Sequence, residues 1–141
     1  MLLGVRARAA LGLIAAFAAH GAGAATYPVV FAPGTPGPEQ KAVLQTLEAY
    51  VRAIEGEDID LFRSVIPGLS DEEEQRARKA FATVDSHTVE MTVEEIEVRG
   101  EDAVARARRR DTINGSIVSS FPQMFRLRRA GEAWIIREIG R

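Results

Sequence analysis

The sequence predicts an α+β domain in which N-terminal helices pack on the concave face of a strongly curved antiparallel sheet. Apolar residues recur at spacings of three and four up to about residue 84, the period of an amphipathic helix. From His87 onward, apolar and polar residues alternate, as in a strand with one buried face. Because the helical segments come first and the alternating segments follow, the order is typical of an α+β architecture.

The first two helices are expected on either side of a short loop. The first covers residues 38–55, where one apolar stripe begins after a proline suited to the first turn. Gly56 suits its C-terminal end. The second helix covers residues 59–65, and Asp58 is its candidate N-cap.

A third, highly charged helix is expected next. It begins at Ser70, which has Glu73 at capping-box spacing, and it ends between residues 81 and 84. Acidic residues fill its first turn, where the helix dipole favours negative charge. The strands that follow are expected over residues 87–98, 103–113, 125–129 and 134–139.

The last two strands are expected to form a hairpin around Gly131-Glu132. A two-residue turn there places Leu127 opposite Ile136 and Arg129 opposite Trp134. The apolar residues of both strands then share one face, as a core requires.

A plain turn in the middle hairpin does not place the apolar residues of both strands on one face. A plain Asn114-Gly115 turn pairs Ala105 with Met124, which puts the inward alanines on the same face as Arg126. One inserted residue corrects the mismatch, and a proline marks a plausible place for it. We therefore predict a β-bulge at residues 120–122, which would also bend the sheet.

Three segments are expected along the 141-residue chain. Residues 1–24 resemble a signal peptide, with two early arginines, a short apolar run and an A-x-A pattern at residues 22–24. The alternative is a membrane anchor, but the apolar run is short for a bilayer. Residues 25–38 are rich in proline and glycine and are expected to be a mobile linker. The folded domain is expected over residues 39–141.

Composition limits the possible functions. The chain has no cysteine, which excludes disulfides, thiolate catalysis and cysteine-ligated metals. Loss of Arg6 and Arg8 with the leader leaves 16 basic and 20 acidic residues, which argues against broad binding to nucleic acid or anionic membranes. Arginine far outnumbers lysine, which hints at a bacterial source. We therefore expect a periplasmic or secreted protein without a metal or other cofactor.

Residues 39–139 together resemble the NTF2-like superfamily, also called SnoaL-like. The resemblance is carried by "LEAYVRAIEGEDIDLF" in the helical part, by "IEVRGEDAVARARRR" in the first hairpin, and by the closing "FRLRRAGEAWIIREI". It implies a cone formed by a curved sheet wrapped over the first helix. The superfamily contains isomerases, cyclases, dehydratases and ligand-binding modules, so the fold does not supply the function.

Tyr50 is the candidate catalytic residue that the resemblance implies. In ketosteroid isomerases of this superfamily, a tyrosine in a similar context hydrogen-bonds the developing oxyanion, beside an aspartate base and a protonated aspartate. Here Glu73 and Glu74 belong to a solvated helix, and Asp111 near a turn is the one acid in the later strands up to residue 129. Two of the three parts are therefore missing, and Tyr50 is read as a pocket or core residue.

His87 and the arginine-rich strand have simpler readings. His87 is the one histidine that remains after the expected cleavage, and one histidine without cysteine does not make a zinc site. Sequence neighbours cannot form a triad by adjacency, so His87 is interpreted as a residue at the rim. Arg106, Arg108 and Arg110 alternate with inward positions, Arg109 among them, and are expected to form cross-strand ion pairs on a solvated face. An anion-binding or dimer-forming surface is the alternative. Its candidate residues are Arg106, Arg108, Arg126 and Arg128.

The function expected from the sequence is that of an exported, non-catalytic domain that binds a small hydrophobic molecule or a partner protein. One alternative is an isomerase, cyclase or dehydratase that uses Tyr50 as a hydrogen-bond donor. The other alternative is a homodimeric assembly module. A second ionisable group within reach of the Tyr50 hydroxyl separates the enzyme from the binding module. The expected pocket residues are Leu47, Tyr50, Ile54, Phe81, Met91, Phe125 and Trp134.

Overall fold

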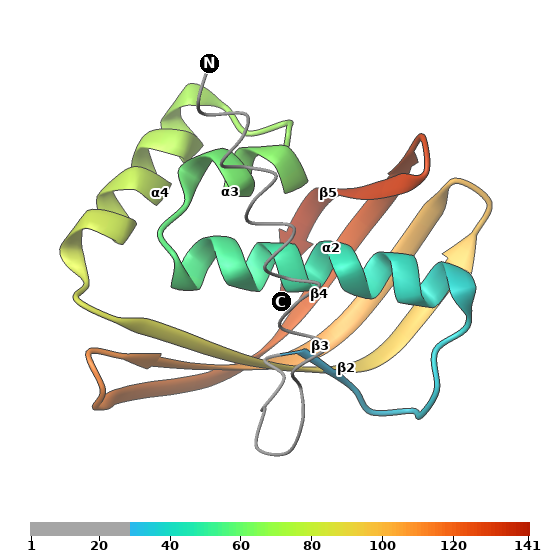
Figure 1. Cartoon of the computed structure of the whole chain (residues 1–141), viewed down its shortest axis with the longest axis horizontal. Coiled ribbons are helices and arrows are strands. Elements are labelled where there is room, and N and C mark those ends of the chain that lie inside the picture. The colour runs from blue at the N-terminus through green and yellow to red at the C-terminus, as the bar shows by residue number, and fades with distance from the viewer. Residues whose placement is uncertain (1–28) are drawn as a thin grey trace, which may run out of the picture.

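The computed structural model describes residues 29–141, and within them three helices pack on a curved, unclosed sheet of five strands (Figure 1). The expected signal peptide and the first residues of the expected linker lie outside this range. In chain order the elements are β1 (Val29–Phe31), α2 (Pro38–Glu55), α3 (Ile59–Val65), α4 (Asp71–Thr83), β2 (His87–Arg99), β3 (Asp102–Ile113), β4 (Ile117–Ala130) and β5 (Ala133–Gly140).

The helices begin and end where the sequence predicts. Gly37 is the N-cap of α2, and Gly56 is its C-cap. The Asp58 side chain accepts a hydrogen bond from the Leu61 amide at 3.0 Å and so caps α3. Ser70 and Glu73 form the expected capping box of α4, with bonds of 3.1 and 2.9 Å.

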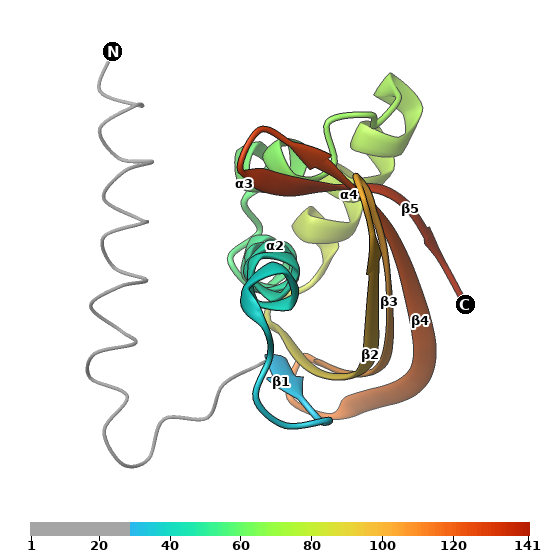
Figure 2. The same cartoon turned by 90° about the vertical axis from the view of Figure 1, so that its right-hand side faces the viewer.

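The core lies between α2 and the concave face of the sheet. Figure 2 shows the strands curving around α2, which presents its apolar stripe to them. The most deeply buried large side chains are those of Trp134, Phe125, Leu47, Met91, Leu127, Ile136, Val43, Val51, Val89 and Val93. Thr46 also ties α2 to the sheet, because its hydroxyl donates to the buried Trp134 carbonyl at 2.8 Å.

The prediction that residues 25–38 are a mobile linker is wrong at the first strand. Val29–Phe31 pairs in parallel with β2, so the sheet is mixed rather than wholly antiparallel, and residues 29–31 belong to the domain. The prolines misled the prediction because they flank this three-residue edge strand rather than interrupt it. Val29 is 6% exposed and joins the core cluster, whereas Val30 is 50% exposed.

The predicted bulge at residues 120–122 is wrong, because the middle hairpin has none there. Strands β3 and β4 pair without any register shift, with Ala105 opposite Phe125. The extra residue lies in the turn, because the loop between Ile113 and Ile117 has three residues rather than two. Two of them, Asn114 and Gly115, have positive φ angles of 53° and 77°. The final hairpin pairs as predicted, with Leu127 opposite Ile136 across a two-residue turn.

The sheet instead carries bulges in β2 and β5. The β2–β3 register shifts between Val93 and Glu95, and the β4–β5 register shifts between Arg126 and Leu127. At each shift two consecutive residues are exposed between inward-facing apolar neighbours, which is the mark of an inserted residue. These pairs are Glu94-Glu95 in β2 and Arg137-Glu138 in β5. Since bulges bend the strands that carry them, they account for the curvature around α2.

Candidate functional site

Tyr50 points from α2 into the interior of the cone and is 5% exposed. Its ring packs edge-on against Phe125 at 5.3 Å and stacks on Phe62 at 5.9 Å, measured between ring centroids. Its hydroxyl oxygen accepts a hydrogen bond from Nη1 of Arg109 at 2.9 Å. A second ionisable group therefore lies within hydrogen-bond reach of Tyr50, which is the condition set for an enzyme site.

Arg109 reaches Tyr50 because it occupies an inward position of β3. The positions before it on this face, Ala105 and Ala107, are small and buried, while Arg108 and Arg110 point outward. Its guanidinium also forms a two-pronged contact with Asp111, from Nε to Oδ1 at 2.6 Å and from Nη2 to Oδ2 at 2.7 Å. A buried guanidinium needs such a partner to offset the loss of its hydration.

Asp111 connects this pair to His87. Its Oδ2 atom lies 2.6 Å from Nε2 of His87, which begins β2 on the neighbouring strand. Gln123 on β4 accepts a longer bond from Arg109 at 3.4 Å. The resulting set of residues, called the Tyr50–His87 chain below, runs Tyr50, Arg109, Asp111, His87, with Gln123 at its side. It joins one helix and three strands on the concave face.

Within the Tyr50–His87 chain, each charged residue stabilises the ionised form of its neighbour. Burial is the strongest influence on the pKa of Asp111 and raises it, but hydrogen bonds and positive charge from Arg109 and His87 outweigh burial, so this pKa lies below its ordinary value. Burial likewise acts most strongly on Arg109 and lowers its pKa, but the contacts with Asp111 and Tyr50 outweigh it and leave the pKa raised. Both residues are therefore ionised at neutral pH.

The ionised state of Asp111 fixes how His87 is protonated. A carboxylate only accepts hydrogen bonds, so the contact at Oδ2 requires a proton on Nε2 of His87. In a neutral imidazole, Nδ1 is then an acceptor. Within residues 29–141, neither this Nδ1 nor the Tyr50 hydroxyl proton has a hydrogen-bond partner. The Tyr50–His87 chain thus ends in a donor at Tyr50 and, whenever His87 is neutral, in an acceptor at Nδ1.

The expected pocket residues lie together, but as tightly packed core. All seven belong to or pack against one apolar cluster, and Phe81 is the one that remains partly exposed. Two depressions within residues 29–141 lie elsewhere, one on the convex face of the sheet and one between α3 and α4. The expected cavity at these residues stays a prediction. Trp134 has one notable feature, since its buried Nε1 has no hydrogen-bond partner among the described residues.

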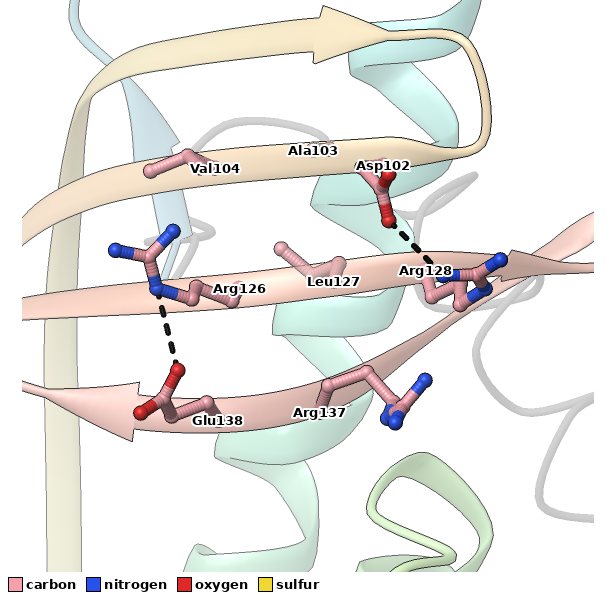
Figure 3. A pocket seen from close by; sticks show the side chains of 8 residues that line it. All are labelled: Asp102, Ala103, Val104, Arg126, Leu127, Arg128, Arg137 and Glu138. Carbon is pink, nitrogen blue, oxygen red and sulfur yellow. Dashed lines mark hydrogen bonds and ion pairs between the residues drawn. The ribbon is translucent and has the colours of Figure 1, made fainter.

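The four candidate arginines for an anion or interface site all lie on the convex face, away from the Tyr50–His87 chain. Arg106 pairs with Glu95 and Arg126 with Glu138, both at 3.2 Å, and Arg128 pairs with Asp102 at 3.5 Å. All of these side chains are at least half exposed. Arg126 and Arg128 also line the convex depression (Figure 3).

Residues 29–141 contain no cluster of three or more histidine, aspartate or glutamate side chains placed to hold a metal ion. No helix in this part of the chain is long and apolar enough to cross a membrane.

Comparison with known proteins identifies the fold. No protein-family model matches the sequence, and no curated protein resembles it in sequence. Solved structures do match. A candidate dehydratase of the NTF2-like family from Streptomyces avermitilis has a TM-score of 0.60 at 13% identity, over 74% of this chain and 95% of that one. An NTF2-like protein of unknown function from Shewanella oneidensis has a TM-score of 0.62 at 13% identity, over 72% and 96%.

A third match is a candidate scytalone dehydratase from Novosphingobium aromaticivorans, with a TM-score of 0.62 at 9% identity, over 72% of this chain and 80% of that one. These identities are low, so the matches show the fold alone. The chain has the NTF2-like fold that the sequence predicted, an α+β cone in which helices pack on a curved sheet.

The Tyr50–His87 chain was not predicted from the sequence, although Tyr50, Asp111 and His87 were each considered as candidates. Arg109 carried a detectable signal, because a charged residue follows two alanines at inward positions of a strand. The contact between Asp111 and His87 carried none, since it depends on the register of β2 against β3. Asp111 lies near the turn after β3, as the sequence indicated, but its burial opposite Val89 was not predicted.

Proposed function

We propose that this domain binds a small molecule that carries a polar oxygen. The binding site is the concave face of the sheet, at the end where the Tyr50–His87 chain lies. The observation that carries the proposal is the hydrogen bond from buried Arg109 to the Tyr50 hydroxyl at 2.9 Å. It occupies the acceptor side of the hydroxyl and leaves its proton for a ligand oxygen. Structures with the same fold include candidate dehydratases, which agrees with a site for small organic molecules.

The residues around the Tyr50–His87 chain indicate what the rest of the ligand is like. Phe62 and Phe81 pack edge to face at 5.7 Å between centroids, and both are partly exposed. Phe121 lies under the Arg109 guanidinium at 5.4 Å. These rings offer apolar contact surface beside a few fixed polar groups, a common composition for small-molecule sites. A ligand meets His87 first, because its side chain is 15% exposed and Tyr50 lies deeper.

A titration with 4-nitrophenol tests this binding, because its visible absorption reports whether it is bound as the phenol or as the phenolate. We expect a saturable change with the wild-type domain. Tyr50→Phe removes only the hydroxyl and should weaken binding by about tenfold. Asp102→Asn, which alters an exposed pair on the convex face, is the matched control and should bind like the wild type. A linear, non-saturating response in the wild type contradicts the proposal.

A second candidate function is proton-transfer catalysis, and the contact between His87 and Asp111 favours it. Asp111 holds the proton on Nε2, which leaves Nδ1 of His87 to accept a proton from a substrate. For a ketone, the bond between hydrogen and the carbon next to the carbonyl breaks, and the proton moves to Nδ1 of neutral His87. The electron pair of that bond forms the carbon–carbon double bond of the enolate, and the carbonyl π electrons move onto the oxygen. The Tyr50 hydroxyl then donates a hydrogen bond to that oxygen, as in ketosteroid isomerases.

Deuterium exchange separates this candidate from simple binding. The protons next to the carbonyl of cyclohexanone exchange slowly in D₂O, and NMR follows their loss. A catalyst with one positioned base should accelerate the exchange by about 10²-fold or more. His87→Gln should abolish this acceleration while leaving 4-nitrophenol binding measurable. Equal exchange with wild type and His87→Gln leaves the binding function and rejects the catalytic one.

We also propose that the protein is exported and that residues 1–24 are removed. The support is the pattern of two arginines, a short apolar run and small residues in the sequence. Intact mass measurement of the protein from a bacterial periplasmic fraction tests this, and a mass that retains Met1 contradicts it. Formation of a homodimer remains a prediction, and light scattering of the same sample checks it.

A further inference from the structure

The bulge in β5 brings an extra arginine to the convex face of the sheet. Ile136 and Ile139 both contact the core, so the two residues between them cannot alternate in the usual way. Arg137 and Glu138 are consequently both exposed, and Glu138 lies opposite Arg126 of β4. A regular strand would present one charged side chain here instead of two.

A depression of about 610 Å³ lies at this place. Its floor is the backbone around Ala103 and Leu127, whose side chains are buried on the other side of the sheet. Figure 3 shows three arginines around it, and the Arg128 and Arg137 guanidinium groups extend toward the same end of the groove. The lining residues are Asp102, Ala103, Val104, Arg126, Leu127, Arg128, Arg137 and Glu138. We call this depression the convex groove.

The convex groove has more positive than negative side chains. Glu138 holds Arg126 at 3.2 Å, and Asp102 holds Arg128 at 3.5 Å. Each carboxylate occupies part of a guanidinium that has five N–H donors. Arg137 forms no ion pair with any other residue in the described range. The groove therefore has one positive charge in excess, and two of its arginines are already oriented by their partners.

We propose that the convex groove binds a phosphate group, either as the free ion or as a monoester. A tetrahedral oxyanion presents several acceptor oxygens, and planar guanidinium groups match it with paired N–H donors. Arg137 supplies the charge, Arg128 flanks it on β4, and Asp102 and Glu138 can accept a hydrogen bond from a hydroxyl of the ligand. This site does not depend on the function proposed for the concave face.

The surroundings favour a small anion over a nucleic acid. The neighbouring strand β2 carries Glu90, Glu95 and Glu97 on the same face, and the whole chain has a net charge of −2. A long polyanion laid across the sheet would meet these carboxylates, whereas a single phosphate group fits within the groove. The volume also lies in the range of small-ligand sites.

NMR of the arginine Nε–Hε groups tests the proposal, because these signals respond directly to a bound anion. Inorganic phosphate is titrated at constant ionic strength against sodium chloride. We expect saturable shifts at the groove arginines with phosphate and none with chloride. Arg137→Gln should weaken phosphate binding by about fivefold. Arg110→Gln is the matched control, since Arg110 lies on the same face but pairs with Glu90 outside the groove.

A parallel titration with glycerol phosphate distinguishes the two sources of the phosphate group. Tighter binding of the ester indicates a phosphorylated metabolite, and equal binding indicates the free ion; either result supports the site. Shifts that are equal in phosphate and chloride overturn it, as do shifts that persist unchanged in Arg137→Gln. Light scattering at the same concentrations adds a further check, because a dimer whose groove signals ignore phosphate would show that a second copy occupies this face.

Discussion

Nε2 of His87 lies 2.6 Å from Oδ2 of Asp111, although 24 positions separate the two residues in the sequence. The contact exists because β2 and β3 pair antiparallel, with Val89 opposite Asp111, which brings the first residue of β2 close to the carboxylate. Arg109 holds the same carboxylate from the other side. One buried acid therefore serves both a permanent cation and a titratable ring.

Asp111→Asn should strongly destabilise the domain. The substitution leaves the Arg109 guanidinium buried without a negative partner, and removal of one member of a buried pair typically costs about 3–5 kcal/mol. Urea unfolding followed by circular dichroism measures the loss. Asp102→Asn, in an exposed pair with Arg128, should change the free energy of unfolding by less than about 1 kcal/mol. Equal losses in the two variants would show that Arg109 does not depend on its buried partner.

The depressed pKa of Asp111 predicts a specific loss of stability in acid. A carboxyl whose folded pKa lies below its unfolded value of 3.8 stabilises the fold while it is ionised. That contribution is fully present above the unfolded pKa and disappears as the pH falls through the folded pKa. The free energy of unfolding should therefore decline on acidification below about pH 5, and it should decline less steeply in Asp111→Asn. Parallel profiles for the two proteins would contradict the assignment.

The pKa of Glu48 is shifted in the opposite direction from that of Asp111, so its effect on stability has the opposite dependence on pH. Burial on α2 raises its pKa, and the nearby Arg52 offsets this only in part. The folded state thus favours the protonated form, so stability is lost as the pH rises through the interval between the unfolded and folded pKa values. Glu48→Gln should raise the free energy of unfolding at neutral pH by about 0.5 kcal/mol. Thermal unfolding measures the change, and Glu132→Gln in an exposed turn should leave it unaltered.

Local patterns were enough to predict most of the fold. The helices begin at capping residues and end at glycine or after an apolar stripe, and these signals lie within a few residues of the element they define. The strands from β2 onward were found from their alternation, except for residues 117–124 of β4, and the bulges in β2 and β5 each interrupt this alternation by one residue. In contrast, β1 was missed because a three-residue edge strand has no period of its own and gains stability only from burying Val29 against the core.

The candidate site could be predicted only in part, for a related reason. Tyr50 was found because a helical stripe shows which side chains face the sheet. Its partner Arg109 and the contact between Asp111 and His87 depend on which residues of different strands lie opposite each other. For Asp111 and His87 that register is the pairing of β2 with β3, which an inserted residue between Val93 and Glu95 shifts by one position. A bulge that the sequence analysis did not predict was therefore enough to hide this contact.

The first strand offers a direct test of where the domain begins. Val29→Ala removes two buried methyl groups and should lower the free energy of unfolding by about 1–2 kcal/mol. Val30→Ala is the neighbouring control, and its side chain is half exposed, so the change should stay within about 0.5 kcal/mol. Urea unfolding of the two variants compares them. If both behave like the wild type, residues 29–31 act as the linker that the prolines suggest.

The turn between β3 and β4 should be sensitive to a single added methyl group. Gly115 has a φ of 77°, and a side chain in this left-handed region costs about 1–2 kcal/mol even though no atom lies within 4 Å of the added Cβ. Gly115→Ala should therefore destabilise the domain by about this amount. Gly68→Ala provides the matched control, because its Cβ also meets open space but its φ lies outside that region, so the alanine should be neutral or stabilising. Since both substitutions add the same methyl group to an uncrowded turn, a difference between them in thermal unfolding isolates backbone strain. Equal effects would mean that the turn can relax, and the β3–β4 register that brings Gln123 close to Arg109 would then have to be held by the strands themselves.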